Sequence, residues 1–310
     1  MSEQSRRIAL VFPGQGSQQP QMAVPWQGHP AYTLWERADD VLKQPVTRLG
    51  TEADAAELKQ ADNCQIALFV QHAMLLEAFA EHGVAITLTA GHSLGEYNAL
   101  LAAQVLGFDD ALQLVAVRAR STMEAAQARP GTMVACLGFD RADVETAARN
   151  AGAFLANENA PGQITVSGSK EALNQLKSAL ADKGGRIVDL DVGAAYHSPH
   201  VEAAVPVLGE ALDQAAFHDA STGVVANADA KIHTAAHDWP QLLRIQLTSP
   251  VLWKESVETM VREGITDTVE LGASAPLSGM IKRIARGVRR HMVHRPEDIE
   301  TVVNALRTDS

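Results

Sequence analysis

Cysteine is scarce in this sequence. The 310 residues contain only two cysteines, Cys64 and Cys136, and neither lies in a paired or metal-spaced motif. This usage excludes a disulfide-based scaffold and a zinc site. We therefore expect no bound metal and a reducing compartment.

Long apolar runs are also absent. No stretch approaches the roughly 18 consecutive apolar residues that indicate a membrane-spanning helix. Residues 1–8 include basic side chains, but no adequate apolar run or cleavage site follows them, so no secretory signal is predicted. We expect a cytoplasmic protein with no membrane partner.

Positive charge is in the minority. The chain has 26 Lys and Arg against 37 Asp and Glu, which gives a formal net charge of −11. Such an acidic balance argues against nucleic acid as a partner. With 46% hydrophobic residues, a chain of 310 residues is long enough for one large domain that carries an insertion.

The most informative motif is Gly91-His92-Ser93-Leu94-Gly95, which fits the pattern G-x-S-x-G. In α/β enzymes this pattern forms a sharp turn between a strand and a helix, and the turn exposes the serine hydroxyl. Residues 84–90 before it are typical of a strand, and residues 96–101 after it of a helix. Ser93 is therefore a candidate nucleophile, and the alternative is an ordinary helix N-cap serine.

A second motif lies near the N-terminus. Residues 8–12 are apolar and typical of a buried strand, and Pro13-Gly14-Gln15-Gly16-Ser17-Gln18 follows them. A glycine-rich turn lets backbone N–H groups and a side-chain amide approach a ligand closely. The segment is no phosphate-binding loop, because the Gly-Lys-Ser/Thr ending is missing. Taken alone it could be a simple tight turn.

Together, residues 12–18 and 91–97 closely resemble the malonyl-CoA:acyl carrier protein transacylase family, which includes acyltransferase units of polyketide synthases. The resemblance continues in the family's order through four further segments: residues 114–118, 156–163, 195–199 and 249–253. It implies an enzyme that transfers an acyl group through a serine ester.

The resemblance implies a role for each matching residue. Ser93 is the acylated nucleophile, His197 is its general base, and the backbone carbonyl of Gln246 orients the histidine. Gln15 and the backbone N–H of Leu94 occupy the oxyanion-hole positions. The chemistry agrees, because a serine hydroxyl needs an imidazole in hydrogen-bond reach and the imidazole needs a partner that fixes its tautomer.

Two further residues address the substrate. Arg118 is similar to the residue that binds the free malonyl carboxylate, which a planar guanidinium can do bidentately. Without the resemblance, an arginine on an apolar helix could simply snorkel, and Arg120 is expected to face solvent. Tyr196 stands where malonyl-selective members carry a bulky aromatic and methylmalonyl-selective members a small residue. The sequence thus favours malonyl.

Three segments depart from the family pattern. Gln65-Ile66 replaces a common Gln-Pro pair, residues 270–275 replace a Gly-Pro-Gly-like turn, and Glu158 stands where an uncharged residue is usual. A carboxylate near an anionic substrate would oppose binding. Glu158 is therefore either turned to solvent or a sign of a different acyl group.

The alternation of strand-like and helical runs predicts an α/β fold with a parallel sheet. We expect an α/β-hydrolase-like large domain from residues 1–128 and 198–310, and a ferredoxin-like small subdomain from residues 129–197. The subdomain prediction rests on a β-α-β-β-α-β order, with elements expected at residues 133–137, 140–151, 154–156, 163–167, 170–183 and 186–192. The active site is expected in the cleft between the two parts.

A basic cluster stands out near the C-terminus of this acidic chain, and it includes Lys282, Arg286, Arg289 and Arg290. One interpretation is a docking surface for an acidic carrier protein. The other is the cationic end of a helix, which the helix dipole stabilises.

The function we expect is a ping-pong transfer of malonyl from malonyl-CoA to the phosphopantetheine thiol of an acyl carrier protein, in fatty acid or polyketide biosynthesis. No bound cofactor is implied. The alternatives are an acyl hydrolase that edits a polyketide pathway, the malonyl-transferring subunit of a malonate decarboxylase, and a non-catalytic scaffold. Arg118 argues against a hydrolase of neutral acyl groups.

Overall fold

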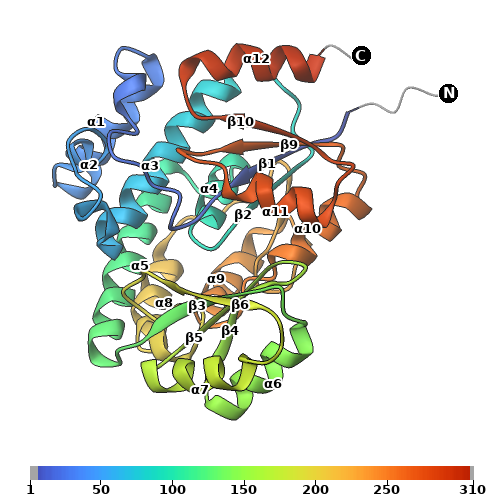
Figure 1. The fold of residues 1–310 in the computed structure, drawn as a ribbon. Helices are drawn as coiled ribbons and strands as arrows, with labels where there is room; N and C mark the ends of the chain where they lie inside the picture. Colours follow the sequence, from blue (N-terminus) through green and yellow to red (C-terminus); the bar gives the residue numbers. More distant parts are fainter. Residues whose placement is uncertain (1–5, 308–310) are drawn as a thin grey trace.

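The structure is a computed structural model that describes residues 6–307, and it is an α/β fold with two β-sheets (Figure 1). The larger sheet has the strand order β10-β9-β1-β2-β7-β8, and only β8 runs antiparallel to its neighbour. Its strands are β1 (Ile8–Phe12), β2 (Leu88–Gly91), β7 (Gly223–Val225), β8 (Ile232–His233), β9 (Asp267–Leu271) and β10 (Arg289–Val293). The carboxyl ends of β1, β2 and β9 therefore meet at one edge.

Helices cover both faces of this sheet. Every residue of β1 is buried; Ile8, Leu10 and Phe12 join one apolar cluster, while Ala9 and Val11 join a second on the opposite face. This division follows from the two-residue period of a strand. The helices are α1 (Thr33–Leu42), α2 (Val46–Thr51), α3 (Ala61–Ala80), α4 (Gly95–Ala102), α5 (Phe108–Ala128), α8 (Ala204–Gln214), α9 (Trp239–Thr248), α10 (Trp253–Arg262), α11 (Pro276–Ile284) and α12 (Pro296–Arg307).

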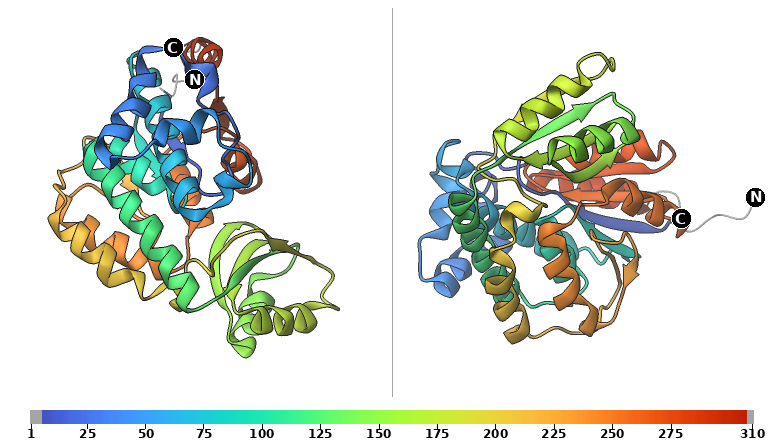
Figure 2. Two further views of the ribbon diagram at one scale, coloured as in Figure 1. Left: turned by 90° about the vertical axis from the view of Figure 1, so that its left-hand side faces the viewer. Right: turned by 90° about the horizontal axis from the view of Figure 1, so that it is seen from below.

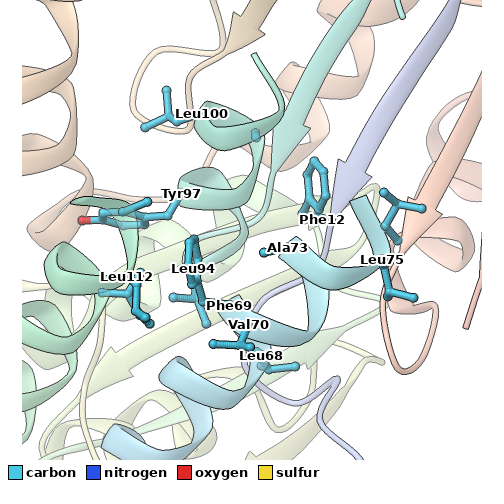
Figure 3. Close-up of a cluster of buried hydrophobic side chains, with 14 of the residues drawn as sticks. Phe12, Leu68, Phe69, Val70, Ala73, Leu75, Leu94, Tyr97, Leu100 and Leu112 are labelled. Carbon is cyan, nitrogen blue, oxygen red and sulfur yellow. The ribbon is translucent and has the colours of Figure 1, made fainter. Parts of the chain in front are cut away.

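The helix that follows Ser93 lies in the centre of the larger cluster. Residues 95–100 of α4 are all buried. Leu94 and Tyr97 lie among Phe12 of β1, Phe69 of α3 and Leu112 of α5 (Figure 3). Close packing of this kind allows little movement, so Ser93 stands on a rigid support. No helix within residues 6–307 is long and apolar enough to cross a membrane.

The smaller sheet is antiparallel with the order β4-β5-β3-β6, and its chain order with its helices is β-α-β-β-α-β. It forms a separate lobe with a core of its own, visible in green and yellow in the left view of Figure 2. Its elements are β3 (Thr132–Leu137), α6 (Arg141–Ala151), β4 (Phe154–Ala160), β5 (Gln163–Gly168), α7 (Lys170–Leu180) and β6 (Arg186–Leu190).

Several boundaries differ from the sequence-based expectation. The strand expected at residues 84–90 begins only at Leu88, because the first residue of β1 that pairs with β2 is Ala9, opposite Leu88. β4 extends to Ala160 rather than 156, since two register shifts let its polar residues keep pairing with β5. The sequence does not predict β9 and β10. Arg289 and Arg290 lie on β10 and not at a helix end.

Candidate active site

Ser93 lies in a strained turn between β2 and α4. Its φ is 53°, a left-handed value that non-glycine residues seldom adopt. A Cβ on Gly91 would lie 1.9 Å from the carbonyl oxygen of Gly95, and a Cβ on Gly95 would lie 2.1 Å from that of Phe12. Both glycines of the motif are thus required by close backbone approach, as a nucleophile turn demands.

The structure brings Ser93 and His197 together across 104 positions of sequence, with Oγ 2.7 Å from Nε2. His197 Nδ1 lies 2.9 Å from the backbone oxygen of Gln246. Because a carbonyl only accepts, Nδ1 carries the proton and Nε2 is free to accept from Ser93. Burial, followed by the charge of Arg118, lowers the pKa of His197 to about 3, which keeps the imidazole neutral.

Arg118 reaches the same point from α5 and is 1% exposed. Its Nη2 donates to Ser93 Oγ at 3.1 Å, and its Nη1 donates to Gln65 Oε1. Its guanidinium carbon lies 5.9 Å from the ring centroid of Tyr97. Within residues 6–307 no Asp or Glu forms an ion pair with Arg118, and burial lowers its pKa. A buried cation that no carboxylate contacts fits a site that receives an anion.

The two oxyanion-hole candidates are Leu94, which directly follows Ser93, and Gln15, in the loop after β1. Leu94 directly precedes α4, and no acceptor for its N–H is found among residues 6–307, as is usual at the start of a helix. Burial raises the pKa of the Tyr196 hydroxyl and of the Cys64 thiol, and the Gln15 side chain opposes both shifts.

Tyr196 is 6% exposed and immediately precedes His197. It lines a cavity of about 330 Å³ together with Gly193, Ala194 and Met123. The walls of this cavity come from the α3 region, from α5 and from the segment that leaves the smaller lobe. Arg120 is exposed and lines a different cavity, as expected for a residue on the other face of α5.

The departures from the family pattern have structural explanations. The buried Glu158 carboxylate is bound by Arg141, with 2.9 Å between Oε2 and Nε, so it is paired with a cation. Its neighbour Asn159 places Oδ1 2.8 Å from His92 Nε2. Glu270 accepts the backbone N–H groups of Leu277 and Ser278 at the start of α11. Gln65 is the partner of Arg118.

Two residues of the predicted docking cluster, Arg289 and Arg290, lie at the edge of the larger sheet opposite to that of Ser93. Arg289 forms two 2.8 Å hydrogen bonds with buried Asp267 at the amino ends of β10 and β9, whereas Ser93 follows the carboxyl end of β2. Arg290 Nη1 donates to the Val288 backbone oxygen. Lys282 and Arg286 are exposed, and Lys282 lies in the last turn of α11. This placement favours the helix-end interpretation for Lys282 and a structural role for Arg289.

Sequence reasoning missed two polar residues of the site, Glu96 and Asn227. Asn227 Oδ1 accepts the Ser93 backbone N–H at 2.7 Å. The backbone N–H of Asn227 donates to Glu96 Oε1 at 2.6 Å. A carboxylate within the apolar run of α4 was the available signal for Glu96. Asn227 follows β7 and carries no local motif. Among residues 6–307, no group of three His, Cys, Asp or Glu side chains is arranged to hold a metal ion.

Known proteins are similar to this chain over nearly its whole length. A family model described as acyl transferase domain matches residues 9–304. The malonyl CoA-acyl carrier protein transacylase of Bacillus subtilis (strain 168) is 38% identical over 314 residues, covering 98% of each chain. The protein of that name from Escherichia coli (strain K12) is 32% identical over 300 residues, covering 94% of this chain and 96% of its own.

Solved structures are similar over nearly the whole chain. The malonyl CoA-acyl carrier protein transacylase from Coxiella burnetii has a TM-score of 0.94 at 28% identity, covering 97% of this chain and 98% of its own. A malonyl-transacylase solved in complex with its type II polyketide synthase acyl carrier protein has a TM-score of 0.93 at 31% identity, covering 96% and 99%.

Proposed function

The chain belongs to the acyl transferase family, and from this premise we propose that it transfers a malonyl group from malonyl-CoA to the phosphopantetheine thiol of an acyl carrier protein. The observation that carries the proposal is Arg118, a buried cation without an ion-pair partner in the described chain, whose Nη2 is 3.1 Å from the Ser93 hydroxyl. A free carboxylate on the acyl group supplies the missing anion.

In the first half-reaction, Ser93 Oγ attacks the thioester carbonyl carbon while His197 Nε2 takes the hydroxyl proton. The tetrahedral oxyanion accepts hydrogen bonds from the Leu94 N–H and the Gln15 amide. The carbon–sulfur bond then breaks, and the CoA thiolate takes the proton from His197. A malonyl ester on Ser93 remains, with its carboxylate on Arg118.

In the second half-reaction, the carrier thiol gives its proton to His197 and attacks the ester carbonyl. The carbon–oxygen bond to Ser93 breaks, and His197 returns the proton to the serine. The Gln246 carbonyl keeps the imidazole in the required tautomer in both halves. Tyr196 limits the space beside the α-carbon, which favours malonyl over methylmalonyl.

We also propose that the lobe of residues 129–197 is a ferredoxin-like subdomain inserted into an α/β-hydrolase-like large domain. The strand order β4-β5-β3-β6 supports this division. His197 stands where the chain leaves the lobe, so the relative position of the two parts sets the Ser93–His197 distance.

Transfer and hydrolysis can be separated in one experiment. The protein is mixed with malonyl-CoA and either a holo-carrier, which has the thiol, or the matching apo-carrier, which lacks it. We expect malonyl on the holo-carrier and little free malonate. Free malonate as the main product, at a rate independent of the holo-carrier, would instead identify a hydrolase. Transfer only to the carrier subunit of a malonate decarboxylase would identify that alternative.

A further inference from the structure

Glu96 is a buried carboxylate that the proposed reaction does not use. It is the second residue of α4 and is 1% exposed. No Lys, Arg or His in residues 6–307 forms an ion pair with it. Glu96 Oε1 accepts a hydrogen bond from the backbone N–H of Asn227 at 2.6 Å, and Oε2 accepts one from the side-chain Nε2 of Gln246 at 2.7 Å. Burying a carboxylate that no cation contacts is costly, so its presence there calls for a reason.

Both partners of Glu96 hold the reacting pair. The Asn227 side chain accepts the Ser93 N–H at 2.7 Å and donates to the Gly91 backbone oxygen at 2.6 Å. The Gln246 amide donates to the Ser93 backbone oxygen at 2.8 Å, while its own backbone oxygen accepts from His197 at 2.9 Å. A single bridging residue, Asn227 or Gln246, thus connects the Glu96 carboxylate to the Ser93 turn, and Gln246 also connects it to His197.

We propose that Glu96 is a positioning residue for acyl transfer, whose ionised carboxylate fixes Asn227 and Gln246 so that Ser93 and His197 remain at bonding distance. The inference deepens the proposed function and rests on it. Both groups that face the carboxylate are N–H donors. A proton on either carboxylate oxygen weakens that oxygen as a hydrogen-bond acceptor, which loosens the network.

The charges around Glu96 predict when this occurs. Burial raises the pKa of Glu96 to about 7, opposed by its hydrogen bonds to Asn227 and Gln246 and by the charge of Arg118 on α5. Asp229, in the β7–β8 connection, raises the pKa further, and burial raises the pKa of neighbouring Tyr97 of α4, which is therefore neutral. The base itself, His197, has a pKa of about 3 and does not titrate near neutrality. Ser93 reactivity should therefore fall as the pH falls through about 7.

The test measures the reactivity of Ser93 without malonyl-CoA. Diisopropyl fluorophosphate phosphorylates an activated serine: the Oγ–phosphorus bond forms, fluoride leaves, and His197 takes the hydroxyl proton. The inactivation rate of the full-length protein is followed from pH 5 to pH 9 for the wild type, Glu96→Gln and Glu270→Gln. Glu270 is a matched control because it is a buried carboxylate with two N–H donors, which lie in α11.

We expect the wild-type rate to fall as the pH decreases, with a midpoint near 7. Glu96→Gln should react about 10- to 100-fold more slowly at pH 8, a loss typical of residues that orient a reacting group, and should lose that midpoint. Glu270→Gln should keep the wild-type profile. The inference is overturned if Glu96→Gln keeps the midpoint, or if Glu270→Gln changes in the same way.

A second variant covers the case in which Glu96→Gln does not fold. Gln246→Met removes the donor to Glu96 but keeps the backbone oxygen that holds His197. Since that hydrogen bond lowers the pKa of Glu96, its loss should move the midpoint to higher pH. An unmoved midpoint contradicts the inference. A wild-type protein that shows this pH behaviour but does not transfer malonyl would refute only the proposed function.

Discussion

Replacing Arg118 by alanine should remove the preference for malonyl-CoA over acetyl-CoA. Arg118 is 1% exposed, and the two terminal nitrogens of its guanidinium donate to Ser93 Oγ and Gln65 Oε1. In the malonyl complex the substrate carboxylate becomes its counter-ion. In Arg118→Ala, the carboxylate would enter the same dry site without a partner. Acetyl-CoA carries no such carboxylate, so the loss of the buried Arg118 cation should not slow the reaction with acetyl-CoA.

The size of the effect follows from the burial of the pair. Truncation of one partner of a buried, hydrogen-bonded charge pair costs about 2–5 kcal/mol. Because each 1.4 kcal/mol corresponds to a factor of ten, the malonyl:acetyl ratio of kcat/KM should fall by roughly 30- to 4,000-fold. Arg118→Lys keeps the charge but not the fork, so its ratio should lie between those of the wild type and the alanine variant.

The assay is the rate of self-acylation from each acyl-CoA in the absence of carrier, for the wild type, both Arg118 variants and Arg120→Ala. Arg120 lies two positions along α5 and is exposed, so its removal should leave the ratio unchanged. If Arg118→Ala keeps the wild-type ratio while Arg120→Ala loses it, Arg118 is a structural arginine. The selecting cation is then on the other face of the helix.

Two further variants test the selectivity and the carrier surface. Tyr196→Ser should raise the relative use of methylmalonyl-CoA by about 10- to 200-fold, since it removes a buried ring directly before His197 in the chain. An unchanged malonyl:methylmalonyl ratio of kcat/KM would show that Tyr196 does not limit the pocket. The double variant Lys282→Glu, Arg286→Glu should transfer malonyl to holo-carrier at the wild-type rate at low salt, because both residues lie near the amino end of β10, away from Ser93; a clearly slower transfer with intact self-acylation would restore the docking interpretation.

The approach of Ser93 and His197 could be predicted from sequence because both residues belong to short motifs. The G-x-S-x-G turn has a local steric cause, seen in the contacts of Gly91 and Gly95. Ser93, His197 and the Gln246 carbonyl lie together as the resemblance implied. The six elements of the smaller lobe were also predictable, since each has a clear strand or helix period and a turn at its end.

Other features depend on contacts that the sequence does not display. Asn227 meets Ser93 only because β7 lies beside β2 in the sheet. Glu158 was expected to face solvent or the acyl group, but its partner Arg141 lies in α6. The charged residues Arg289 and Arg290 begin a strand that pairs with β9, and Asp267 of β9 accepts two hydrogen bonds from the Arg289 guanidinium.

The central claim is that Ser93 carries the malonyl group between the two substrates. Its most direct test is peptide mass spectrometry of the protein after incubation with malonyl-CoA alone and then with holo-carrier. We predict a malonyl ester on Ser93 that disappears when holo-carrier is added, and no ester on Ser93→Ala. Malonyl on another residue, or equal labelling of Ser93→Ala, would contradict the account.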